Sequence, residues 1–171
     1  MTEDLNWDLV IVGGGPAGMT SAIYGARYGL KTLLLEEKVL GGAQATSPGI
    51  ENYPGFKFIV GIELANKMKE QVKESGAQIR EITEVKKITK PEEIGGDFIL
   101  ETRRGDYHAK AVIMATGGGH RKLNIPGEEE LTGRGVSYCA TCDGPISHYC
   151  LSTSIRSKNT CVPDPSRTLS R

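Results

Sequence analysis

Two short apolar runs flank a helical pattern near the start of the chain. The first run, at residues 9–12, ends directly in glycines, which predicts a buried parallel strand over residues 8–12 that feeds a tight turn. From Pro16 the small and apolar residues recur at helical spacing, and Gly29 stands where such a helix would stop. The second run, at residues 32–35, predicts another buried strand, which Glu36 closes. Together these segments predict a strand–helix–strand unit.

The middle of the chain changes from loop to helix to strands. Residues 41–58 are rich in glycine and proline and lack a sustained period, which predicts a long functional loop. Helical spacing returns over residues 61–75 and ends at Gly76. The β-forming residues at 78–89, 97–102 and 107–108 predict an antiparallel meander beside the main sheet. Residues 111–116 predict one more buried strand, which three glycines end, so the pattern as a whole is α/β.

Composition limits the classes of partner. The chain has 171 residues, and its 21 Lys and Arg residues balance 21 Asp and Glu residues, so no charge pattern favours nucleic acid or an anionic membrane. The N-terminal residues are acidic and unlike a signal peptide, and no apolar run is long enough to span a bilayer. We therefore expect a cytoplasmic protein. In that compartment, four cysteines favour redox or metal chemistry over a structural disulfide framework.

A glycine-rich loop, Gly13-Gly14-Gly15-Pro16-Ala17-Gly18, joins the first strand to the first helix. Its spacing matches the dinucleotide fingerprint, in which the first glycine permits the turn, the second admits the pyrophosphate and the third allows close helix packing. Glu36 ends the next strand and can accept hydrogen bonds from a ribose, with Glu37 as the alternative. The competing interpretation is that the glycines serve only the turn. The context favours a dinucleotide site.

Cys139 and Cys142 are separated by two residues, which lets their sulfurs approach within disulfide reach. Three interpretations are open: a reversible disulfide, half of a zinc site with Cys150 and Cys161, or two ordinary thiols. The zinc spacing fits poorly because Cys150 and Cys161 are far apart in an irregular segment. We favour the disulfide and predict no metal. Asp143 then serves as a proton relay, or alternatively as a carboxylate at a helix N-terminus.

The character of the chain changes at residue 147. Residues 147–171 are rich in serine, threonine and arginine and show no periodic apolar face, so we expect an irregular, poorly ordered tail. The sequence contains one glycine fingerprint, where an enzyme with two dinucleotides would carry two.

The chain resembles the low-molecular-weight thioredoxin reductases, which are FAD-dependent pyridine nucleotide-disulfide oxidoreductases. The resemblance runs in order from about residue 8 to 146 and rests on five motifs: GGGPAG at 13–18, ENYPGF at 51–56, ATG at 115–117, IPGE at 125–128 and GVSYCATCDGP at 135–145. It implies a Rossmann-like, three-layer FAD-binding domain with a parallel sheet and an antiparallel meander, into which an NADPH-binding domain is inserted. Electrons would pass from NADPH to flavin, then to the disulfide, then to thioredoxin or a similar small thiol protein.

The resemblance also implies roles for single residues. Cys139 would exchange with thioredoxin, Cys142 would lie nearer the flavin, and Asp143 would act as acid and base. Ala43 departs from the family pattern, where glutamine is common, and Gln44 is the neighbouring candidate for that hydrogen bond. The residues expected to hold FAD are Gly13, Gly15, Pro16, Ala17, Gly18, Glu36, Gly41, Gly42, Ala43, Asn52, Thr116 and Gly117.

The resemblance stops after Ile146. We therefore divide the chain into residues 1–146, an incomplete FAD-binding domain that includes the start of the NADPH domain, and residues 147–171, a disordered or frameshifted tail. This division predicts impaired NADPH turnover and weak FAD retention. Two alternatives stay open: a non-catalytic flavin-binding fragment, and a relative that takes electrons from another donor such as ferredoxin. A homodimer is compatible with the family.

Overall fold

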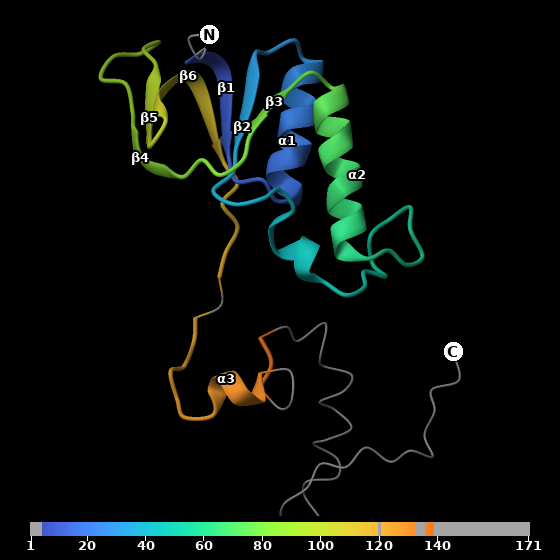
Figure 1. Ribbon diagram of the computed structural model, residues 1–171. Coiled ribbons are helices and arrows are strands. Elements are labelled where there is room, and N and C mark those ends of the chain that lie inside the picture. The colour runs from blue at the N-terminus through green and yellow to red at the C-terminus, as the bar shows by residue number, and fades with distance from the viewer. Residues whose placement is uncertain (1–4, 120, 133–135, 139–171) are drawn as a thin grey trace, which may run out of the picture. The chain divides into compact units, whose positions relative to one another are not determined.

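The computed structural model describes residues 5–119, 121–132 and 136–138, and the chain forms two compact units, Met1–Gly118 and Gly119–Arg171. The first unit is built on a six-stranded mixed sheet in the order β3-β2-β1-β6-β5-β4 (Figure 1). β1, β2, β3 and β6 are parallel, whereas β4, β5 and β6 form an antiparallel meander. The α/β class, with a parallel sheet and a meander, is therefore confirmed. The strands are Asn6–Val12 (β1), Thr32–Leu35 (β2), Gln78–Arg80 (β3), Val85–Thr89 (β4), Phe98–Thr102 (β5) and Gly105–Met114 (β6).

The predicted strand–helix–strand unit is confirmed as β1, the helix α1 (Pro16–Arg27) and β2. Leu9 pairs with Thr32 and Val12 with Leu35, so the two apolar runs lie side by side in the sheet. All four residues of β2 are buried, which explains why this run has no polar alternation. A strand covered on both faces must be apolar along its whole length.

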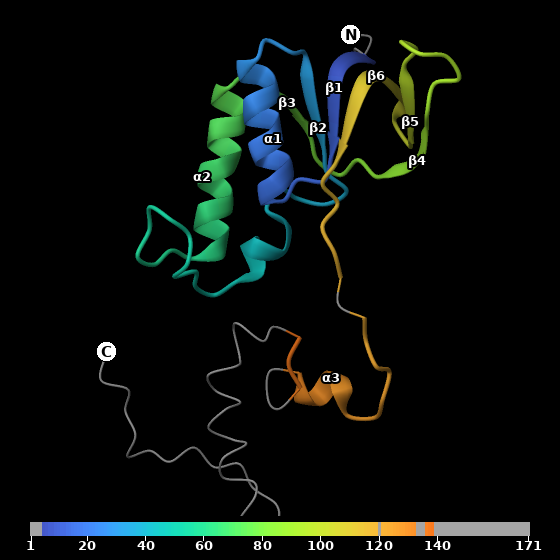
Figure 2. The same ribbon diagram turned by 180° about the vertical axis from the view of Figure 1, so that it is seen from behind.

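Each face of the sheet carries its own buried hydrophobic cluster. Leu9, Ile11 and Leu34 face α1 and the helix α2 (Gly61–Glu74), with Met19 and Met68 from these helices in the same cluster. The two helices lie next to each other on this face in both views (Figures 1 and 2). The opposite cluster joins β1 and β2 to the meander: Trp7, Val10, Leu33, Leu35, Leu100, Tyr107 and Ala109.

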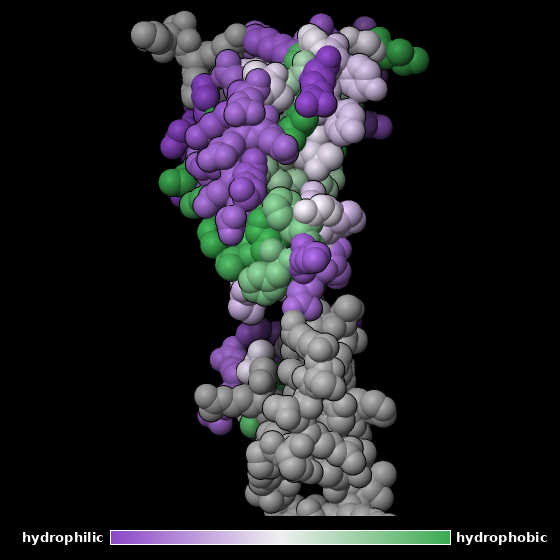
Figure 3. Space-filling model, turned by 90° about the vertical axis from the view of Figure 1, so that its right-hand side faces the viewer, coloured by the Kyte–Doolittle hydropathy of each residue, from purple (hydrophilic) through white to green (hydrophobic). Residues whose placement is uncertain are grey.

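The helix α2 is amphipathic. It buries Leu64, Ala65, Met68 and Val72 against the rest of the unit, as the sequence period predicts. Its outer surface is mainly hydrophilic, and hydrophobic residues gather near the loop that precedes it (Figure 3). That loop contains a short 3₁₀ helix, η1 (Gly42–Thr46), and an isolated bridge between Ile50 and Ile59. The prediction of a long loop at this place is confirmed with these two additions.

Three details of the predicted strands are wrong. The strand predicted as buried over residues 111–116 is largely exposed, since Ala111, Ile113 and Met114 are exposed in β6. Residues 78–80 do not belong to the meander, because β3 pairs in parallel with β2 and extends the main sheet. Residues 107–108 and 111–114 are not separate strands, because both lie in β6, which pairs with β5 through its first half and with β1 along most of its length. A single strand thus connects the meander to the parallel sheet.

The second unit contains the helix α3 (Glu128–Leu131), which follows Gly127 in a left-handed conformation. Glu128 is buried and accepts hydrogen bonds from the backbone N–H groups of Leu123 (2.9 Å) and Ile125 (3.4 Å). The IPGE motif therefore forms a self-contained turn. Within the described parts of the chain, no helix has the length and apolar character needed to cross a membrane.

Candidate dinucleotide site

The glycine loop turns sharply between β1 and α1. Gly13 has φ +110°, a conformation that favours glycine, and its N–H donates to the carbonyl oxygen of Leu35 at 2.9 Å. A Cβ atom at Gly13 would overlap the carbonyl oxygen of Ala115, and it would lie 3.0 Å from Cα of Thr116. Residue 13 must therefore be glycine both for its backbone angle and for the close approach of the chain after β6.

Gly18 and Gly15 differ in what surrounds them. A Cβ atom at Gly18 would overlap the carbonyl oxygen of Gly13, so this glycine allows α1 to pack against the loop. A Cβ atom at Gly15 would meet only Cα of Gly42, at 3.9 Å, within a radius of 4 Å. Nothing in the packing of the residues that the structure describes explains why residue 15 is glycine. The free space there is what a ligand that approaches the backbone would need.

The start of α1 faces the same space. Gly15 is the N-cap residue, Pro16 occupies the first helical turn, and Ala17 is exposed. The first N–H groups of a helix have no carbonyl partner in their own helix, and the helix dipole adds partial positive charge at this end. The first turn of α1 contains no acidic residue. Together with the free space at Gly15, these features suit the phosphates of a nucleotide.

Glu36 lies directly beside the glycine loop. Its Oε2 accepts the N–H of Gly14 at 2.6 Å and its Oε1 accepts the N–H of Lys38 at 2.9 Å. The side chain is half-buried, and each carboxylate oxygen retains capacity for a second hydrogen bond. Glu37, the alternative ribose ligand, is exposed.

The segment Gly41-Gly42-Ala43 packs against the glycine loop from the other side. The N–H of Gly41 donates to the carbonyl oxygen of Gly14 at 2.8 Å, and a Cβ atom at Gly42 would lie 2.9 Å from Cα of Gly15. Ala43 is exposed within η1. Gln44 directs its side chain to α2, where Nε2 contacts the sulfur of Met68 at 3.4 Å. It is therefore engaged in packing in this structure.

The remaining predicted ligands lie at different distances from this arrangement. Thr116 is exposed and follows directly on the contact between Ala115 and Gly13, while Gly117 has φ +69°. Asn52 is exposed inside the loop that the bridge between Ile50 and Ile59 closes, and the contacts described for the first unit do not bring it to the glycine loop. Cys139, Cys142 and Asp143 lie outside the described residues, as do Cys150 and Cys161. The described residues contain no cluster of His, Cys, Asp and Glu able to hold a metal ion.

Three residues that sequence reasoning missed form a chain of contacts that leads from α2 to the glycine loop. Leu40 is buried, and its side chain would lie 3.0 Å from a Cβ atom at Gly14. Its N–H donates to Glu81 at 2.9 Å, and Glu81 also pairs with Lys69 of α2 at 2.8 Å. No local motif marks these positions, because Leu40 and Glu81 are 41 residues apart.

Comparison with known proteins identifies the family of the chain. The family model for pyridine nucleotide-disulphide oxidoreductases matches residues 7–149. The chain belongs to this flavoprotein family, which generally implies FAD and NADPH.

Within the family, the chain is similar to the thioredoxin reductases. It is 44% identical over 144 residues to the thioredoxin reductase of Bacillus subtilis strain 168, a match that covers 84% of this chain and 44% of that protein. The thioredoxin reductase of Streptococcus pyogenes MGAS5005 aligns with a TM-score of 0.71 and 43% identity over 84% of this chain and 46% of that one. A ferredoxin-flavin thioredoxin reductase from Clostridium acetobutylicum aligns with a TM-score of 0.59 and 36% identity over 82% of this chain and 48% of that one. The chain thus spans just under half the length of these relatives.

Proposed function

We propose that residues 13–18, Glu36, the segment 41–43 and residues 116–117 bind FAD, and that this chain is the FAD-binding part of a thioredoxin reductase-like oxidoreductase. Pro16 and Ala17 begin the helix that faces the pyrophosphate, Glu36 accepts from the adenosine ribose, and Asn52 lies on the flavin side. The observation that carries the proposal is the free space at Gly15, which the packing of the described residues leaves unexplained. A bound flavin would supply two-electron redox chemistry.

Cys139 and Cys142 are the proposed reversible disulfide, with Asp143 as the acid and base that serves the leaving thiolate. Thioredoxin, or a similar small thiol protein, is the proposed acceptor, and NADPH is the donor in the enzyme this chain represents. We extend the FAD-binding segment to residue 146 and treat residues 147–171 as a separate segment.

A second candidate differs in the electron donor. The similarity to a protein described as a ferredoxin-flavin thioredoxin reductase favours a donor other than NADPH as the alternative. Anaerobic reduction of the flavin-loaded chain distinguishes the two. Bleaching by reduced ferredoxin alone favours this alternative, bleaching by NADPH favours NADPH as the donor, and no bleaching by either favours a flavin-binding fragment. Size-exclusion chromatography tests the proposed homodimer.

Two glycine substitutions test FAD binding directly. Gly15→Ala places a methyl group in the free space and, because Gly15 has φ −76°, it should leave the fold intact. We expect FAD affinity to fall by about tenfold or more, or roughly 1.4 kcal/mol, with an unchanged unfolding midpoint. Gly25→Ala is the matched control on the same helix, since its Cβ would lie 2.7 Å from Leu9 and 2.8 Å from Thr32. It should lower stability. Equal FAD affinity in Gly15→Ala and the unchanged chain would contradict the proposal.

A further inference from the structure

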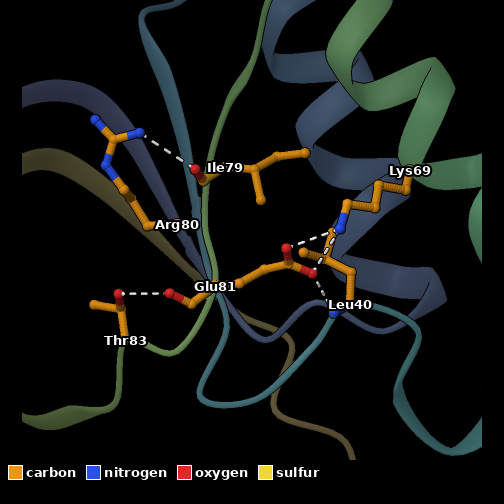
Figure 4. A network of polar contacts seen from close by, with 6 residues as sticks. All are labelled: Leu40, Lys69, Ile79, Arg80, Glu81 and Thr83. Atoms are coloured by element: carbon orange, nitrogen blue, oxygen red, sulfur yellow. Dashed lines mark hydrogen bonds and ion pairs between the residues drawn. The ribbon is translucent and has the colours of Figure 1, made fainter.

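Glu81 lies just beyond β3, and its side chain turns back toward the loop that follows β2 (Figure 4). Its Oε1 accepts the N–H of Leu40 at 2.9 Å, and both of its oxygens accept from Nζ of Lys69 at 2.8 Å. The side chains of Lys69 and Glu81 are only 25% and 28% exposed, so solvent screens this pair less than a surface pair. Burial raises the pKa of Glu81, but the hydrogen bonds from Lys69 and Leu40 and the charges of Lys69 and Lys73 lower it more. The group is ionised at neutral pH.

The backbone around Glu81 is tied to the same loop. The N–H of Glu36 donates to the carbonyl oxygen of Arg80 at 2.9 Å, and the N–H of Thr83 donates to that of Glu36 at 2.8 Å. Between them, the N–H of Ile82 donates to Lys38 at 3.0 Å. Ile82 has φ +55°, which a β-branched residue adopts only when its surroundings impose it. The segment 80–83 therefore holds the loop 36–40 through backbone bonds at one end and the Glu81 carboxylate at the other.

The loop 36–41 meets the glycine loop at both of its ends. Glu36 accepts the N–H of Gly14, and Gly41 donates to the carbonyl oxygen of Gly14. Leu40 precedes Gly41 and packs toward Gly14. The Leu40 N–H held by Glu81 is thus one residue away from the segment that touches Gly15. A shift of Leu40 would move Gly41 and Gly42, and with them one wall of the space at Gly15.

We propose that Glu81, held by Lys69, is a positioning residue for the dinucleotide site: it touches no cofactor and acts by fixing Leu40 and so the place of Gly41 and Gly42. This inference rests on the proposed FAD binding. It predicts that the site is sensitive to an ion pair between α2 and the end of β3, neither of which carries a dinucleotide motif.

The test compares four variants of the full chain for FAD affinity. Glu81→Ala should weaken FAD binding by about tenfold, roughly the worth of one hydrogen bond to a charged group, because the Leu40 N–H loses its acceptor. Glu81→Gln keeps an oxygen that accepts the Leu40 N–H and should restore most of the affinity, and Lys69→Met should fall between them. Glu101→Gln is the control, because it removes the exposed Lys87–Glu101 pair on β4 and β5, with an Nζ to Oε1 distance of 3.0 Å. It should bind FAD as the unchanged chain does.

A second readout needs no flavin. In the flavin-free protein, amide hydrogen exchange of Leu40 should speed up in Glu81→Ala and stay slow in Glu81→Gln, while exchange at Leu34 in β2 stays slow in both. If Glu81→Ala does not fold, the FAD affinities of Glu81→Gln and Lys69→Met decide whether Glu81 positions the site.

The outcomes separate the two proposals. An unchanged chain that binds no FAD overturns the proposed function and the inference with it. An unchanged chain that binds FAD, beside folded Glu81 and Lys69 variants that bind it equally well, overturns the inference alone. Variants that lose thermal stability but keep their FAD affinity also overturn the inference alone, since they show that Glu81 and Lys69 act in folding only.

Discussion

Replacing Glu36 with glutamine changes one heavy atom and should remove one of the two backbone hydrogen bonds that the carboxylate accepts. The two carboxylate oxygens accept from two separate donors, the N–H of Gly14 at 2.6 Å and the N–H of Lys38 at 2.9 Å. Glutamine has one acceptor oxygen and one donor NH₂ group. One of the two N–H groups would therefore face another donor. The substitution is isosteric but does not preserve the hydrogen bonds.

The magnitude follows from the kind of bond that is lost. Hydrogen bonds to charged groups contribute about 1.5–3 kcal/mol, and the half-buried position of Glu36 places the loss near the lower end of that range. We expect Glu36→Gln to lower the free energy of unfolding by about 1.5 kcal/mol and to weaken FAD binding by about tenfold, since the same carboxylate is the proposed ribose ligand.

Urea unfolding followed by the fluorescence of Trp7, the chain's single and buried tryptophan, measures the first effect, and titration with FAD measures the second. Glu37→Gln is the control, because Glu37 is adjacent and exposed. The reasoning is refuted if Glu36→Gln leaves both quantities unchanged, or if Glu37→Gln weakens FAD binding more than Glu36→Gln does. The second result would assign the ribose to Glu37.

Three further substitutions test other parts of the fold. The hydrogen bonds from Lys110 and from the N–H of Lys31 hold the pKa of Asp8 below its usual 3.8, so this contact stabilises the fold above pH 3.8 and is lost as the pH falls through the lowered pKa. In Lys110→Met, an NMR titration should find the Asp8 pKa closer to 3.8, and an unchanged pKa would exclude Lys110 as the cause. Ile82→Gly should raise the free energy of unfolding by roughly 0.5–1 kcal/mol, because relief of the backbone strain at φ +55° exceeds the entropy cost of glycine and the 71% exposed side chain contributes little packing. A loss of stability in urea unfolding would contradict this. Met114 is 59% exposed at the end of β6, beyond Ala109, where the pairing with β5 ends. Met114→Lys should therefore reduce ANS binding and self-association. Equal ANS fluorescence in the variant and the unchanged chain would refute the role of this apolar strand end.

The sequence predicts most of the parallel sheet because a strand buried on both faces must be apolar throughout. Thr32–Leu35 is such a strand, and its bounds agree with the prediction. β3 escapes this reasoning because its three residues are polar or half-buried, and its place is set by pairing with β2, more than 40 residues earlier. The sequence pattern divides β6 in two because Lys110 interrupts its apolar residues, although the strand continues through that residue. Short edge strands depend on contacts that no local pattern records.

The residues of the candidate site likewise divide into those that a local sequence pattern marks and those that only long-range contacts bring into place. Gly13, Gly15 and Gly18 are marked by their spacing, and the structure gives each the surroundings that the fingerprint requires. Glu36 is predictable because it follows a buried strand, at the separation from the glycine loop along the sequence that the fingerprint expects of its acidic residue. Leu40, Lys69 and Glu81 are not, since an ion pair between a helix and the end of a strand leaves no trace in either segment alone.

Gly14 shows how these parts depend on one another. It occupies a variable position of the fingerprint, yet it is buried, its N–H bonds Glu36 and its carbonyl oxygen accepts from Gly41. A Cβ atom there would lie 3.0 Å from both Cβ of Glu36 and Cγ of Leu40. A side chain at residue 14 would therefore push on the proposed ribose ligand and on the residue that Glu81 holds. In this chain Gly14, the second glycine of the run, is thus favoured by the loops that close the site, in addition to the three glycines that the fingerprint specifies.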